Sequence, residues 1–205
     1  MSSTRIQAFV GPMFSSKTEA LHGQLRRQAH ARRTVVLFRP TTDTRDRGDN
    51  TLSAHDGGSS FEPQRLPGKN YIEWVNSSAE VLKLTQQRQA DAIGIDEGQF
   101  FDEALPDILS QLHREGVKLF YAGLDTDWRA QPFATTAKVM MCPEVNVHKM
   151  TAVCSLCGSE TATRSLKKDA GLLDKNKVID PGGQEKYDAA CESCYFKVMN
   201  LTPTV

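Results

Sequence analysis

The chain has 205 residues, and its 25 basic and 25 acidic residues cancel to a formal net charge of zero at pH 7. This balance gives no reason to expect a nucleic acid or an anionic membrane as a partner. No apolar run approaches the roughly 18 residues of a membrane span, and the first residues lack the pattern of a signal peptide, so a cytoplasmic protein is expected. The length allows one sizeable core with a small appendage.

The stretch RIQAFVGPMFSSKT, residues 5–18, predicts a strand, a loop and the start of a helix. Gly11, Lys17 and Thr18 fit the phosphate-binding pattern G-x-x-x-x-G-K-[ST], whereas Ser16 stands in place of the second glycine. Such a loop aims backbone N–H groups, a lysine and a hydroxyl at a polyphosphate and its Mg²⁺. The alternative is an ordinary strand-to-helix turn, since a Cβ at residue 16 can crowd a phosphate.

The rest of the first 150 residues alternates apolar strand patterns with helical ones, which predicts an α/β fold with a parallel sheet flanked by helices. Helices are expected at 18–31, 77–89 and 102–115, the last capped by Asp102, and further strands at 34–39, 91–96, 117–122 and 145–150. Residues 40–70 are rich in Asp, Gly, Ser and Thr and predict a long loop. The carboxyl ends of parallel strands gather at one edge, where ligands bind.

Two carboxylates follow the apolar strand that contains Ile93. Side chains of adjacent residues point apart, so Asp96 and Glu97 can take different roles, one holding Mg²⁺ and one accepting a proton from a substrate hydroxyl. The alternative is the solvated start of a loop.

The cysteines form two C-x-x-C pairs, Cys154 with Cys157 and Cys191 with Cys194. Four thiolates complete a closed tetrahedral zinc site, which is structural in type. The alternatives are redox motifs or unligated thiols. The composition changes at residue 151, where cysteine pairs, glycines and scattered Lys and Asp begin, which predicts an α/β domain with the candidate P-loop at 1–150 and a zinc-binding domain at 151–205.

Five motifs together resemble the type II, zinc-containing thymidine kinases, and they occur in order over nearly the whole chain. They are GPMFSSKT, IDEGQFF, GLDTDWRAQPF, KMTAVCSLC and EKY followed by CESCY. The resemblance implies a P-loop NTPase-like domain followed by a zinc-ribbon domain. It also implies that residues 166–187 form a lasso that closes over a bound nucleoside.

The resemblance implies transfer of the γ-phosphoryl group of ATP, with Mg²⁺, to the 5′-hydroxyl of thymidine and of deoxyuridine. Glu97 would be the base on that hydroxyl, and Thr18 and Asp96 would serve Mg²⁺. The implied phosphate-binding residues are Gly11, Met13, Phe14, Ser15, Ser16, Lys17, Thr18 and Arg45. The implied nucleoside-binding residues are Met13, Asp43, Phe101, Leu124, Trp128, Phe133, Thr163 and Tyr187.

The family also implies a homotetramer and feedback inhibition by dTTP. The main rival is a degenerate homologue that binds nucleoside or nucleotide as an assembly subunit without turnover, and Ser16 motivates it. A second rival, a zinc-ribbon module that binds nucleic acid, is disfavoured by the zero net charge.

Overall fold

The computed structural model describes residues 5–43, 61–168 and 185–199. Their main element is a six-stranded sheet in the order β3-β2-β4-β5-β1-β6, in which all neighbouring strands are parallel. The strands are β1 (Ile6–Val10), β2 (Val35–Pro40), β3 (Asn70–Val75), β4 (Ala92–Ile95), β5 (Lys118–Gly123) and β6 (Val145–Lys149). The predicted α/β fold with a parallel sheet is confirmed.

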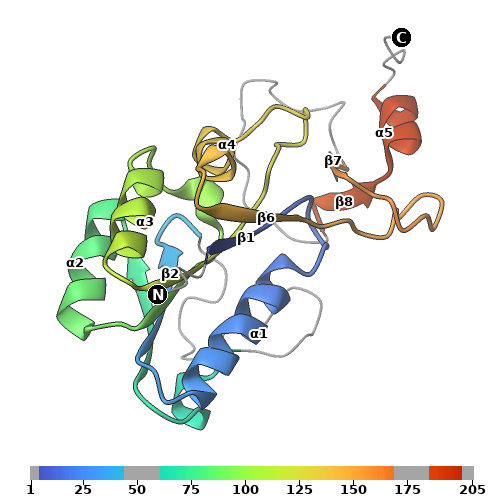
Figure 1. Cartoon of the computed structure of the whole chain (residues 1–205). Helices are drawn as coiled ribbons and strands as arrows, with labels where there is room; N and C mark the ends of the chain where they lie inside the picture. Colours follow the sequence, from blue (N-terminus) through green and yellow to red (C-terminus); the bar gives the residue numbers. More distant parts are fainter. Residues whose placement is uncertain (1–4, 44–60, 169–184, 200–205) are drawn as a thin grey trace.

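Four helices cover the two faces of this sheet (Figure 1). They are α1 (Lys17–His30), α2 (Ser78–Arg88), α3 (Leu105–Arg114) and α4 (Ala134–Met141). Because side chains alternate along a strand, β2 buries Val35 and Leu37 against α1 and Val36 and Phe38 toward the face of α2, α3 and α4. Both faces of the sheet are thus buried, as a parallel sheet requires.

The segment from residue 151 forms a smaller unit with its own two-stranded antiparallel sheet, β7 (Arg164–Lys167) and β8 (Tyr187–Ala190), followed by α5 (Glu192–Val198). We call its described residues, 151–168 and 185–199, the cysteine unit. It has a separate apolar cluster that includes Ala152, Ala162, Leu166 and Tyr195. Figure 1 shows the unit beyond the carboxyl ends of β1 and β6.

Besides the elements of the cysteine unit, one strand and one α-helix were not predicted. Strand β3 lies at the edge of the sheet and is mostly half-buried, and Glu73 interrupts the apolar run of its sequence NYIEWV. Helix α4 contains Thr135 and Thr136, which are poor helix formers. Their hydroxyls make buried tertiary hydrogen bonds, to the Phe101 carbonyl at 2.8 Å and with the Tyr121 hydroxyl at 2.7 Å.

The predicted cap of α3 is wrong. The helix begins at Leu105 after Ala104, and the Asp102 carboxylate instead accepts the backbone N–H of Ser78 at 2.8 Å and that of Ala104 at 3.1 Å. Short 3₁₀ turns occur at η1 (Pro63–Arg65) and η2 (Gly98–Phe100). Among the described residues, no helix is long and apolar enough to cross a membrane.

Candidate active site

The predicted phosphate loop connects β1 to α1, with the strand before it and the helix after it as expected. A Cβ at Gly11 would overlap the backbone carbonyl of Met150, so only glycine fits there. Within the loop, the Ser15 hydroxyl donates to the Pro12 carbonyl at 2.8 Å, and Lys17 Nζ donates to the same carbonyl and to Ser15 Oγ. Hydrogen bonds among the loop's own residues therefore stabilise the conformation of the phosphate loop.

Ser16, the residue in place of the second glycine, precedes α1 in the left-handed region with φ 56°. Its side chain is exposed and makes no cap hydrogen bond with the helix. The serine thus adopts the backbone conformation that a glycine would adopt freely, at a strain cost of about 1 kcal/mol. The serine therefore leaves the order of strand, loop and helix intact.

Asp96 follows β4 at the carboxyl edge of the sheet and is 2% exposed. Its Oδ1 accepts the Thr18 hydroxyl at 3.1 Å and the Glu97 N–H at 3.0 Å. The structure therefore joins the two motifs, 78 residues apart, on which the sequence prediction of a magnesium site rested. A hydroxyl and a carboxylate are the oxygen ligands that Mg²⁺ accepts beside nucleotide phosphates, so the residues present fit the ion.

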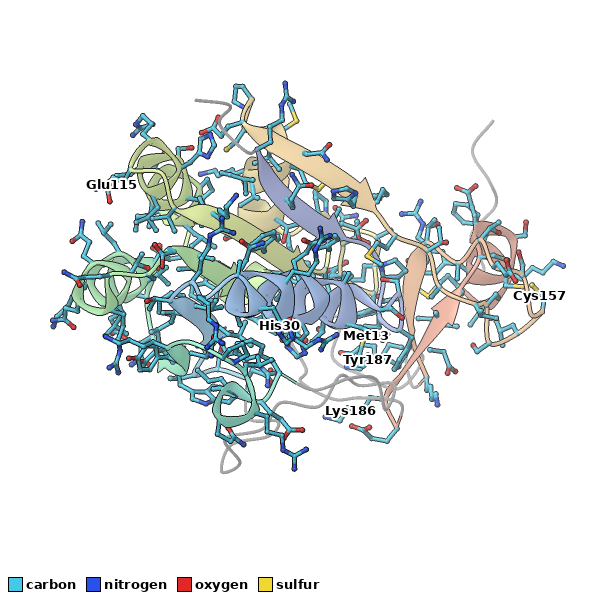
Figure 2. All side chains as sticks on the ribbon, turned by 60° about the horizontal axis from the view of Figure 1, so that its bottom comes forward. Met13, His30, Glu115, Cys157, Lys186 and Tyr187 are labelled. Atoms are coloured by element: carbon cyan, nitrogen blue, oxygen red, sulfur yellow. The ribbon has the colours of Figure 1, made fainter. Side chains whose placement is uncertain are left out.

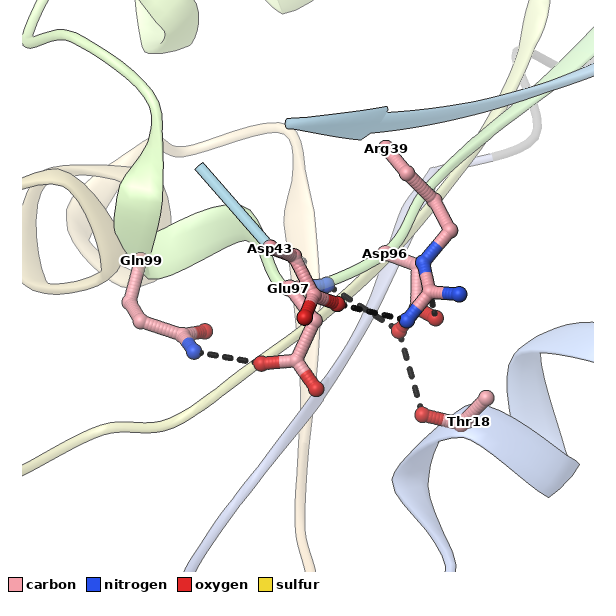
Figure 3. Close-up of polar contacts among 6 residues, drawn as sticks. All are labelled: Thr18, Arg39, Asp43, Asp96, Glu97 and Gln99. Carbon is pink, nitrogen blue, oxygen red and sulfur yellow. Dashed lines mark hydrogen bonds and ion pairs between the residues drawn. The ribbon is translucent and has the colours of Figure 1, made fainter. Parts of the chain in front are cut away.

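Arg39, which the sequence prediction did not include, lies between two buried carboxylates (Figure 3). Its Nη2 is 2.6 Å from Asp43 Oδ2, and its Nε is 3.6 Å from Asp96 Oδ2. Asp43, expected at the nucleoside, is thereby linked to Asp96, expected at the metal. We call Thr18, Arg39, Asp43, Asp96, Glu97 and Gln99 the carboxylate cluster.

Glu97, the predicted base, is half-buried and has a left-handed backbone with φ 51°. Strained backbone of this kind is common at functional sites. Gln99 donates to Glu97 Oε2 at 2.6 Å through its amide nitrogen, while its amide oxygen accepts the Leu124 N–H at 2.9 Å. Gln99 therefore links the Glu97 carboxylate to the backbone of the loop after β5. That loop contains several of the residues predicted to bind the nucleoside.

The residues predicted to bind the nucleoside fall into two groups. Met13, Leu124, Phe133 and Thr163 are half-buried, while Asp43, Phe101, Trp128 and Tyr187 are buried. Phe101 packs within the main core beneath the sheet edge. The Lys167 ammonium lies 6.0 Å from the ring centroids of both Trp128 and Tyr187, so these two aromatic residues share one neighbour. Arg45 lies outside the described residues.

The cysteine unit contacts the phosphate loop through Ser165 on β7, whose hydroxyl accepts the Met13 N–H at 3.0 Å. Ser165 is two residues beyond Thr163, which the family resemblance implied as a nucleoside-binding residue. Ser165 is buried, whereas Thr163 is half-buried. Figure 2 shows Met13 and Tyr187 at the same end of the sheet, with Cys157 farther out.

Sequence reasoning missed Arg39, Gln99 and Ser165. A signal existed for Arg39, because it is the one charged residue in the apolar run of β2, and for Gln99, because it belongs to the IDEGQFF motif. Ser165 gave no local signal, since its importance comes from a contact with a residue 152 positions away.

The four paired cysteines converge, with all their sulfur atoms within 4.8 Å of one another. Burial alone would raise the pKa of Cys154, but backbone N–H donors from Cys191, Leu156 and Cys157 lower it to about 6. Hydrogen bonds with Cys191 and Cys157 raise the pKa of Cys194 to about 12. A thiolate that forms near neutral pH and three sulfurs within reach fit a structural zinc ion.

Comparison with known proteins points to one family. A family model described as thymidine kinase matches residues 4–195. The thymidine kinase of Mesoplasma florum is 35% identical over 195 residues, which covers 93% of this chain and 90% of that protein. The thymidine kinases of two Porphyromonas gingivalis strains are 36% identical over 192 residues, covering 94% of this chain and 85% of theirs. The chain therefore belongs to the thymidine kinase family and is a kinase.

Proposed function

We propose that this kinase transfers the γ-phosphoryl group of ATP to the 5′-hydroxyl of thymidine, and of deoxyuridine, to give the monophosphate and ADP. The observation that carries the proposal is the contact between Thr18 and Asp96, which unites the phosphate loop with the carboxyl edge of β4. The family match adds the substrate class, because the relatives are thymidine kinases.

In this proposal the phosphates lie against the N-terminus of α1, where the N–H groups of Phe14, Ser15 and Ser16 and the Lys17 ammonium would face them. Arg45 would add a further positive charge. Thr18 and Asp96 would hold Mg²⁺. When bound, this ion would neutralise negative charge on the β- and γ-phosphate oxygens. Catalysis then depends on positioning and charge stabilisation by these side chains.

Glu97 removes the proton of the 5′-hydroxyl while the 5′-oxygen of the nucleoside attacks the γ-phosphorus. A bond forms between that oxygen and phosphorus, the bond to the β-phosphate oxygen breaks, and ADP leaves with the electron pair. The hydrogen bond from Gln99 fixes the Glu97 carboxylate beside the loop that contains Leu124. The nucleoside would contact Asp43 with its sugar, and Met13, Phe101, Leu124, Trp128, Phe133, Thr163 and Tyr187 with its base.

We further propose that residues 1–150 and 151–205 are two domains and that Cys154, Cys157, Cys191 and Cys194 bind one structural zinc ion. The separate apolar cluster and the converging sulfurs support both statements. A homotetramer and inhibition by dTTP are further proposals that rest on the family alone. Light scattering of the purified protein and a dTTP titration of its activity test them.

Nothing in the structure or the comparisons favours the degenerate, non-catalytic alternative. The deciding experiment measures ADP and thymidine monophosphate formation by the purified protein and by its Ser16→Gly variant. Phosphorylation by the parent protein, with a rate within about tenfold of the variant, supports the kinase. Activity only in the variant would show that Ser16 silences the loop, and no activity in either would overturn the proposal.

A further inference from the structure

The guanidinium of Arg39 is the one positive charge that the described contacts place between Asp43 and Asp96 (Figure 3). Arg39 is 3% exposed, and the two aspartates are 1% and 2% exposed. A buried charge without a partner is strongly destabilising, and removing one member of a buried ion pair leaves such a charge. Arg39 therefore supplies a counter-charge within 4 Å of both carboxylates.

The two contacts of Arg39 differ in strength. The Asp43 contact, at 2.6 Å, is a charge-assisted hydrogen bond, whereas the Asp96 contact, at 3.6 Å, is an ion pair longer than a hydrogen bond. Asp96 Oδ1 is already held by Thr18 and by the Glu97 N–H. The guanidinium thus fixes Asp43 directly, and it lies beside the second oxygen of Asp96 without forming a hydrogen bond to it.

The guanidinium is itself held in place. Trp74, the partner of Arg39 in the parallel pairing of β3 with β2, lies with its ring centroid 5.0 Å from the guanidinium carbon. Arginine suits this position because its planar fork can stack on an aromatic face and contact two carboxylates at once, whereas lysine presents a single point charge.

We propose that Arg39 is a positioning residue that couples the two ends of the active site, holding Asp43 for the nucleoside and Asp96 for the metal-bound phosphates. The inference rests on the proposed function and adds a residue to it. A single substitution at Arg39 should therefore change both the KM for thymidine and kcat, although Arg39 is not expected to touch either substrate.

The experiment compares the parent protein with Arg39→Gln and Arg39→Lys, using steady-state kinetics at saturating ATP and Mg²⁺. The matched control is Arg88→Gln, because Arg88 also pairs with a carboxylate, Glu73 at 2.6 Å, and lies 4.2 Å from the Tyr71 ring centroid, on α2 rather than at the carboxyl edge. Arg39→Gln should raise the KM for thymidine and lower kcat, each by about tenfold or more, since small misplacements of reacting groups cost up to about 10²-fold. Arg88→Gln should leave both values within about twofold of the parent.

Arg39→Lys separates bridging from simple charge. If Arg39 bridges through two different nitrogens, Nη2 to Asp43 and Nε to Asp96, lysine should restore at most one of the two parameters, because its single ammonium nitrogen cannot reproduce both contacts. Restoration of both, or no change of either in Arg39→Gln, would overturn the inference. Arg39→Lys alone decides the matter if the glutamine variant does not fold.

A readout without turnover completes the test. Thymidine alone should raise the melting temperature of the parent, and Arg39→Gln should lose most of this shift. Asp43→Asn should then cause no further loss in the Arg39→Gln background, since Arg39 acts through Asp43. Independent losses would contradict the coupling. Turnover by the parent protein, measured in the same series, shows whether the proposed function itself stands.

Discussion

The carboxylate cluster and the cysteine unit obtain their geometry in different ways. The cluster lies on the edge of a sheet buried on both faces, so Asp43, Asp96 and Arg39 are fixed by a large apolar core and by one another. The cysteine unit has only two four-residue strands and one short helix around a small cluster. A unit of that size buries too little apolar surface to be stable alone, which is the physical reason for proposing a structural metal there.

The two regions should therefore be sensitive to different substitutions. The carboxylate cluster should stay folded without bound substrates. It should be destabilised by removal of a buried charge or by disruption of the packing around it. The cysteine unit should tolerate surface changes but not loss of its sulfur ligands. The hydrogen bond from the Met13 N–H to Ser165 connects the two regions.

The largest expected effect follows zinc removal. Chelation, or Cys154→Ser, should unfold the cysteine unit, because structural zinc contributes about 10–16 kcal/mol in small zinc peptides. Limited proteolysis should then cleave after residue 150 while the sheet remains protected, and elemental analysis of the parent should give one zinc per chain. Cys142→Ser is the control, since Cys142, whose thiol donates to the Lys138 carbonyl, lies outside the cysteine unit. Simultaneous loss of both regions would show that they are one folding unit.

Glu97→Gln should reduce kcat by about 10²–10⁴-fold, the usual contribution of a general base. The amide retains an oxygen that can accept the Gln99 hydrogen bond, so the melting temperature should change little. Glu103→Gln removes an exposed carboxylate that pairs with Lys138 and should leave turnover unchanged. Parental turnover by Glu97→Gln would remove Glu97 from its proposed role.

Gly98→Ala tests the core beneath the cluster. A Cβ at Gly98 would overlap the Tyr121 ring, which is fully buried and tethered to Thr136, so the free energy of unfolding should fall by about 3 kcal/mol. Gly116→Ala is the control, because the space around that glycine is open and only its φ of +91° opposes a side chain. Its cost should be about 1 kcal/mol. If chemical denaturation shows the same loss in free energy of unfolding for Gly98→Ala and Gly116→Ala, the Tyr121 ring moves aside to accommodate the new Cβ.

Ser165→Ala should have the smallest effect, and it tests the contact between the two regions. The substitution removes the acceptor of the Met13 N–H, which should lower the free energy of unfolding by about 1–3 kcal/mol. It should also raise the KM for thymidine, because Met13 is one of the proposed nucleoside-binding residues. Ser159→Ala, in the same unit, removes a hydroxyl that contacts only Thr161 and should change neither quantity. An unchanged KM in Ser165→Ala would separate the contact from nucleoside binding.

Much of the fold could be predicted because burial on both faces of a parallel sheet leaves continuous apolar runs, as in β2 and β4, and because Leu21, Leu25 and Ala29 repeat at helical spacing. Strand β3 escaped prediction because an edge strand is half exposed and has no such run. Helix α4 escaped because its threonines are stabilised by tertiary hydrogen bonds rather than by helix propensity.

Local patterns in the chain specify the chemical types at the sites: a lysine and threonine after a turn, two carboxylates after a strand, and four thiols in two pairs. They can be read in advance because local spacing decides which ligands a turn can present. The folded arrangement adds that Arg39 lies between Asp43 and Asp96, that Gln99 holds Glu97, and that Ser165 contacts Met13. Those contacts depend on how strands are ordered in the sheet and packed against the cysteine unit, which no local pattern specifies.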